Sequence, residues 1–112
     1  ARNISREQER VNWTKSAIEI HNQIRGLHPW PVAYTTLDGQ TVKLWKADTI
    51  DTDTMELPGT VVKIETDYFV VQTGLGEAIR IDEIQPAGKK KMSANDYLRG
   101  VGSKLRIGDK FE

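Results

Sequence analysis

The sequence predicts a mainly β fold with short helices. The expected architecture is a small closed or partly open barrel of five to six strands, similar to an OB-fold and preceded by a helix. Short runs of alternating apolar and polar residues fill residues 32–84, and turn residues separate them at intervals of roughly 8–12 residues. A helical repeat precedes these runs. A barrel is favoured over an open sheet because so small a meander would leave its edge strands unprotected.

One domain is expected from 112 residues, of which 38% are apolar and 29% charged. We place a linker end with one short helix at residues 1–13 and a single barrel domain at residues 14–112. No apolar run reaches the roughly 18 residues of a membrane-spanning helix. Cysteine is absent, which excludes disulfides, thiolate nucleophiles and cysteine-based zinc sites and fits a reducing compartment.

The first helix is predicted from a capping-box spacing between Ser5 and Gln8. Arg2, Arg6 and Arg10 repeat every four residues, so they would share one face of this helix.

The second helix is expected over about residues 15–25, with Thr14 as its N-cap and Gly26 as its terminator. Prolines at both sides of Trp30 then exclude helix, and we expect Pro29, Trp30 and Pro31 to form a buried structural plug. The apolar stripe of the helix that faces the core comprises Ala17, Ile20, Ile24 and Leu27.

Five strands are expected over residues 32–37, 41–47, 60–65, 68–73 and 78–84, with an acidic loop or edge at residues 48–56. Asp38-Gly39 is the strongest hairpin signal, and Pro58-Gly59 and Gly74-Leu75-Gly76 mark further turns.

After the fifth strand, residues 85–88 break the pattern and Lys89, Lys90 and Lys91 follow in an exposed loop. Ser93 would cap a helix over residues 94–99 that ends at Gly100, and residues 105–111 could add a last short strand.

Catalysis and metal binding find little support, and we expect no catalytic or metal-ligating residue. His21 and His28 lack a third ligand. The segment that carries Asp48, Asp51, Asp53 and Glu56 is not an EF-hand calcium loop, because it has no central glycine and is flanked by predicted strands and not helices. Nucleotide-binding and nucleophile-elbow motifs are absent.

Nucleic-acid binding fits the sequence better than catalysis does. The net charge is zero only because basic residues near the two chain ends cancel acidic residues in the middle. Residues 32–88 carry an excess of six acidic side chains, whereas residues 1–31 and 89–112 carry excesses of two and four basic ones. Solvated surface charge is the simpler alternative. If the two ends share a face, the expected phosphate contacts are Arg2, Arg6, Arg10, Lys89, Lys90 and Lys91, which would bind without sequence preference. Most of the aromatic side chains that could stack on bases, namely Trp13, Trp30, Trp45, Tyr34, Tyr68 and Phe69, are expected in the core.

Several stretches together carry a family resemblance over nearly the whole chain: residues 4–13, the turn at 28–31, the strand at 39–47, residues 57–60 and, most specifically, QPAGKKKMSANDYLRG at 85–100. With these motifs the chain resembles the C-terminal domain of bacterial methionyl-tRNA formyltransferases. The turn at 28–31 and the strand are shared more widely among formyltransferases that use folate, whereas residues 85–100 select the tRNA enzymes.

The resemblance implies a cytoplasmic, monomeric enzyme that transfers a formyl group from 10-formyltetrahydrofolate to the amino group of methionyl initiator tRNA. The chemistry would belong to an N-terminal Rossmann-like domain with an Asn–His–Asp constellation, so this segment alone would be inactive, without cofactor and without membrane contact. Its basic side would position the acceptor arm of the tRNA, although the acidic middle would confine that surface to the chain ends. The alternative is an accessory C-terminal domain of a sugar or folate formyltransferase that binds no RNA.

Overall fold

The computed structural model describes residues 10–27, 32–37, 39–50, 55–100 and 102–112. Several sequence predictions lie outside the described residues: the plug formed by Pro29, Trp30 and Pro31, the capping pair Ser5 and Gln8, and the basic residues Arg2 and Arg6. The elements that the structure defines are, in order, α2 (Ala17–Gly26), β1 (Tyr34–Leu37), β2 (Gln40–Ile50), β3 (Val61–Ile64), β4 (Phe69–Gln72), the 3-10 turn η1 (Gly74–Gly76), β5 (Ala78–Pro86), β6 (Met92–Ser93) and α3 (Ala94–Arg99).

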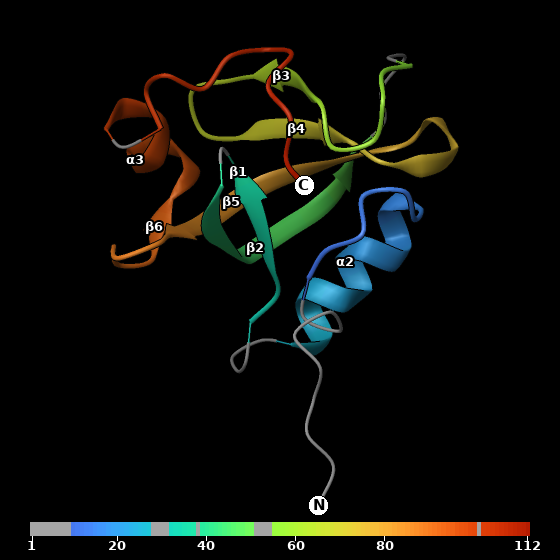
Figure 1. Cartoon of the computed structure of the whole chain (residues 1–112), viewed down its shortest axis with the longest axis horizontal. Helices are drawn as coiled ribbons and strands as arrows, with labels where there is room; N and C mark the ends of the chain where they lie inside the picture. The colour runs from blue at the N-terminus through green and yellow to red at the C-terminus, as the bar shows by residue number, and fades with distance from the viewer. Residues whose placement is uncertain (1–9, 28–31, 38, 51–54, 101) are drawn as a thin grey trace, which may run out of the picture.

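The strands form one curled antiparallel sheet in the order β1-β2-β5-β4-β3, with β6 paired to β5. This confirms the predicted mainly β, OB-like architecture with a helix in front of it. Helices α2 and α3 lie on opposite sides of the curled sheet in Figure 1. The long strands β2 and β5 form its centre, so side chains on their outer face can act together.

Both central strands extend beyond their predicted ends. The sequence predicts a loop or edge from Asp48 onward, and Asp48 pairs with Arg80 as β2 continues to Ile50 alongside β5. Pro86 was expected to break the pattern, yet it ends β5 opposite Val42. Proline has no N–H to donate to the ladder, and the strand ends at this residue. Pairing with a long partner strand therefore overrides the local composition of both segments.

A β-bulge interrupts the β2–β5 ladder at Trp45. The register shifts between Leu44 and Lys46 and again between Lys46 and Ala47. Bulges bend a strand and change the direction in which a side chain points. The bulge lets Leu44 and Ala47 both face the core while Trp45 stays half-buried on the outer side.

Helix α2 begins two residues later than predicted. Ser16, not Thr14, is the N-cap, and its hydroxyl accepts a hydrogen bond from the Glu19 amide at 3.3 Å. Thr14 instead donates its hydroxyl to Asn12 Oδ1 at 2.6 Å. Gly26 lies inside the helix without the left-handed conformation expected of a terminator. The predicted apolar stripe is confirmed, with Ala17, Ile20 and Ile24 buried and Leu27 packed against the core.

Residues 109–112 join the two edges of the sheet. On one side, the Phe111 amide donates to Gly59 O at 2.8 Å and the Asp109 carbonyl accepts from the Val61 amide at 2.7 Å. On the other side, Thr36 of β1 and Glu112 exchange two backbone hydrogen bonds of 3.0 and 2.8 Å. The curled sheet is thereby closed between β1 and β3.

The predicted last strand over residues 105–111 is reduced to a bridge between Thr60 and Lys110. A turn at 106–109 prevents a longer one, because the Asp109 amide donates to Arg106 O and Gly108 takes a positive φ of 102°.

Aromatic rings at the centre hold this closure. Phe111 stacks on Phe69 with a centroid distance of 5.8 Å and lies 6.0 Å from Trp13. Phe69 also contacts Tyr97 of α3 at 6.1 Å. All four side chains are buried, so one aromatic cluster connects the C-terminal segment, β4, α3 and the chain before α2.

We predict that Phe111→Ala lowers the free energy of unfolding by about 3–5 kcal/mol, because it removes a buried ring at the point of closure. That is a large share of the roughly 5–15 kcal/mol of a typical domain. Chemical denaturation measures the loss. Ile107→Ala is the control, since Ile107 is 66% exposed and should change stability by less than about 0.5 kcal/mol. Equal effects of the two substitutions would contradict the role given to Phe111.

Candidate nucleic-acid interface

Residues 87–91 connect β5 to β6 and are called the lysine loop below. Lys89, Lys90 and Lys91 are all exposed, as the sequence predicted. The loop begins with a tight turn in which the Lys89 amide donates to Pro86 O at 3.0 Å. Gly88 takes the positive φ of 74° that a type II turn requires at its third residue. The three ammonium groups therefore extend from a defined hairpin.

Side chains from two strands hold the base of the lysine loop. Trp45 Nε1 donates to Gln85 Oε1 at 2.9 Å, and Gln85 Nε2 donates to the Lys89 carbonyl at 2.9 Å. Lys91 Nζ lies 5.1 Å from the centroid of the Trp45 ring, which is a cation–π distance. The loop is thus fixed on the outer face of β2 and β5.

Cross-strand pairing places further side chains beside this loop. Tyr34 of β1 pairs with Lys43 of β2, and Lys43 pairs with Gln85 of β5. Lys91 directly precedes Met92, which pairs with Ile84 on the other side of β5. Directly opposed residues in an antiparallel ladder share a face, so Lys43 and Lys91 flank Gln85.

Arg10 extends the same row at its other end. It forms an isolated parallel bridge with Tyr34, so it lies in extended chain and not on the predicted helix. The backbone hydrogen bond from the Val11 amide to Tyr34 O, 2.8 Å long, explains this conformation. Arg10 Nη2 donates to Thr36 Oγ1 at 3.0 Å, which directs the guanidinium along β1.

We call this set the cross-strand row: Arg10, Tyr34, Lys43, Gln85 and Lys91. It brings one of the predicted N-terminal basic residues and the lysine loop onto one surface. Neighbouring strands are about 4.8 Å apart, so four steps span roughly 19 Å. Sequence reasoning missed Lys43. The alternation over residues 41–47 placed its side chain on the outer face, but only the strand register shows what lies beside it.

A pocket of about 300 Å³ lies beside Trp45, which donates a hydrogen bond to Gln85 of the row. Exposed Arg25 from the last turn of α2 and exposed Lys46 from β2 contribute to its wall, together with Glu83. Two more basic side chains therefore stand next to the Trp45 ring. Of the other aromatic side chains considered for stacking, Trp13 and Phe69 are buried, Trp30 lies outside the described residues, and Tyr34 and Tyr68 are half-buried.

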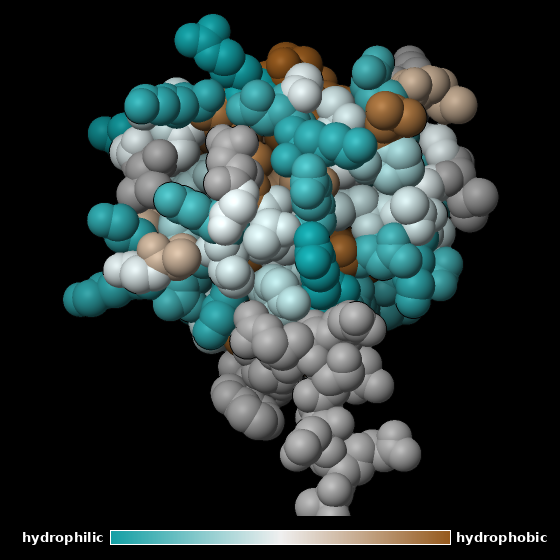
Figure 2. Space-filling view, viewed as in Figure 1, coloured by the Kyte–Doolittle hydropathy of each residue, from teal (hydrophilic) through white to brown (hydrophobic). Residues whose placement is uncertain are grey.

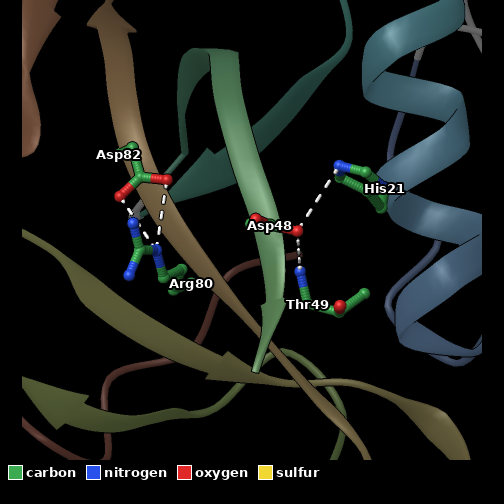
Figure 3. Close-up of polar contacts among 5 residues, drawn as sticks. All are labelled: His21, Asp48, Thr49, Arg80 and Asp82. Carbon is green, nitrogen blue, oxygen red and sulfur yellow. Dashed lines mark hydrogen bonds and ion pairs between the residues drawn. The ribbon is translucent and has the colours of Figure 1, made fainter. Parts of the chain in front are cut away.

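The opposite end of the β2–β5 ladder carries acidic side chains held by neighbouring donors (Figure 3). Asp48 Oδ1 accepts from the Thr49 amide at 2.9 Å and lies 3.7 Å from His21 Nε2. Arg80 Nε lies 3.2 Å from Asp82 Oδ1. By contrast, neither Lys43 nor any lysine of the loop forms an ion pair within the described part of the chain. Unpaired positive charge thus gathers at one end of the ladder.

The described residues contain no group of three or more His, Asp or Glu side chains that could hold a metal ion. None of the described helices is long and apolar enough to cross a membrane. Hydrophilic side chains dominate the face in Figure 2, with hydrophobic atoms confined to small patches.

A family model and individual relatives both match this chain to formyltransferases. Residues 3–102 match the family model described as formyl transferase, C-terminal domain. The chain is 54% identical over 112 residues to the methionyl-tRNA formyltransferase of Lysinibacillus sphaericus (strain C3-41), and 54% identical over 111 residues to that of Bacillus cytotoxicus. These matches cover 100% and 99% of this chain but only 36% and 35% of the relatives, so the chain spans about a third of their length.

Solved structures share the fold at low identity. HypX from Aquifex aeolicus superposes with a TM-score of 0.70 and 17% identity, covering 94% of this chain and 19% of that protein. Its complex with tetrahydrofolic acid gives a TM-score of 0.68 at 19% identity over 85% of this chain and 17% of that protein. Since the family model matches 100 of the 112 residues, the chain belongs to the family of formyl transferase C-terminal domains.

Proposed function

We propose that this chain is the tRNA-binding C-terminal domain of a methionyl-tRNA formyltransferase. The whole enzyme transfers a formyl group from 10-formyltetrahydrofolate to the amino group of methionyl initiator tRNA in the cytoplasm, and its N-terminal Rossmann-like domain carries out the chemistry. The present domain positions the acceptor arm against that catalytic domain. Relatives of that name at 54% identity support the enzyme class, and the cross-strand row supports the RNA contact.

The row has a length and chemistry that suit a phosphate backbone. Its span of roughly 19 Å, at strand spacings of about 4.8 Å, follows several phosphates, which along one strand of DNA are about 3.4 Å apart in axial rise. Lys43, Lys91 and Arg10 supply positive charge along this row. Contacts of this kind position a nucleic acid without reading its bases.

The first prediction concerns the lysine loop. Replacing Lys89, Lys90 and Lys91 together with Ala should weaken binding to initiator and elongator tRNA equally, because lysine–phosphate contacts carry no base information. The slope of log K against log salt should flatten by roughly two to three, since each neutralised phosphate contributes about 0.9 in B-DNA. Titration of both tRNAs at several salt concentrations measures the affinity and the slope.

Lys63→Ala serves as control for the lysine loop. Lys63 lies on the far strand β3, 3.5 Å from Glu65, and its loss should leave the salt slope unchanged. An unchanged slope in the triple variant would place the RNA surface elsewhere. A loss confined to initiator tRNA would mean that the loop reads bases or shape. Absence of any salt-dependent binding by the wild-type chain would favour an accessory domain of a sugar or folate formyltransferase.

A second prediction concerns activity. The chain alone should not formylate methionyl initiator tRNA above background with 10-formyltetrahydrofolate, because the catalytic groups belong to the proposed N-terminal domain. A turnover assay measures this, with the full enzyme carrying the same C-terminal sequence as positive control. Formylation by the isolated chain would overturn the assignment of the chemistry to another domain.

A further inference from the structure

Two hydrogen bonds link Trp45 to Gln85 and Gln85 to Lys89 at the base of the lysine loop, and in each of them donor and acceptor cannot be exchanged. The indole nitrogen of Trp45 is a donor only, and the Lys89 carbonyl is an acceptor only. Gln85 lies between them and satisfies both, with Oε1 toward the indole and Nε2 toward the carbonyl. The donor from Trp45 therefore sets the orientation of the Gln85 amide, and that amide then holds the loop backbone at Lys89.

The ring of Trp45 acts on the other end of the same loop. Lys91 Nζ lies over the indole at 5.1 Å from its centroid. One side chain of β2 thus contacts Lys91 directly and reaches Lys89 through Gln85. Trp45 lies at the register shift of the β2–β5 ladder, one residue after Leu44, which pairs with Ile84 next to Gln85.

A loop of this composition would otherwise sample many conformations. Binding a phosphate would then require ordering several long side chains and their backbone, which weakens association. Anchoring the Lys89 carbonyl and the Lys91 side chain restricts the loop on the sheet, next to the strand that carries Lys43, before any ligand arrives.

We propose that Trp45 is a positioning residue that, through Gln85 and its own ring, holds the lysine loop ready for the phosphate backbone of tRNA. This inference rests on the proposed function and adds residues that make no phosphate contact themselves. The salt dependence of tRNA binding separates a residue that positions the loop from a residue that supplies charge. A variant that loses the anchor keeps every lysine, so tRNA affinity should fall while the salt slope stays constant.

Two variants break the anchor at different points. Trp45→Phe keeps an aromatic ring for Lys91 but has no N–H for Gln85. Gln85→Met keeps the side-chain length but removes both amide hydrogen bonds. Denaturation curves first verify that each variant is folded. Tyr68→Leu is the matched control, because Arg80 lies over the Tyr68 ring at 5.0 Å in a second cation–π pair, outside the cross-strand row.

The first measurement needs no RNA. Amide hydrogen exchange at Lys89 reports loop ordering, because this amide bonds to Pro86 O in the turn that Gln85 braces. We expect exchange to accelerate about three- to tenfold in Trp45→Phe and Gln85→Met, the range for one lost hydrogen bond, and to stay unchanged in Tyr68→Leu. Unchanged exchange in both anchor variants would overturn the proposal.

The second measurement is tRNA affinity at several salt concentrations. We expect a three- to tenfold loss in both anchor variants with an unchanged salt slope, and none in Tyr68→Leu. Faster exchange with unchanged affinity would overturn the binding role of the anchor. A large affinity loss in Trp45→Phe alone, without faster exchange, would overturn it in favour of a direct contact between the indole N–H and the RNA. If the wild-type chain binds no tRNA while the exchange difference persists, the proposed function fails but the anchoring of the loop stands.

Discussion

The contact on which the fold depends is the pairing of residues 109–112 with both edges of the sheet. Without that segment, β1 and β3 would each present a row of unpaired backbone groups, which in water is an aggregation hazard. Gly59 and Val61 bond one side of the segment and Thr36 bonds the other. Phe111, which belongs to the same segment, stacks on Phe69 at 5.8 Å. A short stretch of backbone therefore closes the barrel and fills its centre at the same time.

Closure also determines the surface proposed to bind RNA. Because β1 is fixed on both sides, between residues 109–112 and β2, its register places Tyr34 opposite Lys43. The long β2–β5 ladder then places Lys43 opposite Gln85, and the hairpin into β6 adds Lys91. Charges that are far apart along the chain gather on one face through three strand pairings. The neutral sequence thus gains a locally basic surface, while the carboxylates of Asp48 and Asp82 lie toward the other end of the ladder and contact neighbouring donors.

Local signals predicted the elements well and their long-range partners poorly. The hairpin between Leu37 and Gln40, the Ser93 cap and the apolar stripe of α2 involve residues a few positions apart, so short sequence windows suffice to find them. Ser16 is the better cap by type and has Glu19 three residues later, which is the capping-box spacing that the structure uses, whereas Thr14 bonds to Asn12. The extension of β2 through Asp48 and the position of Arg10 depend on strands distant in sequence. The cross-strand row also depends on the register of β2 against β5, which joins segments far apart in sequence.

Phosphate contacts made through lysine and arginine are weak and indifferent to sequence when a domain acts alone. In the proposed function, such weak contacts still contribute to tight tRNA binding by the whole enzyme, because the domain is covalently joined to a catalytic domain. Once one domain holds the tRNA, the other meets it at an effective concentration set by the linker, and overall binding exceeds either contact alone. Discrimination between tRNAs is then left to the domain that holds the reacting end. An anchored lysine loop fits this division, because it lowers the ordering cost of a generic contact without making it selective.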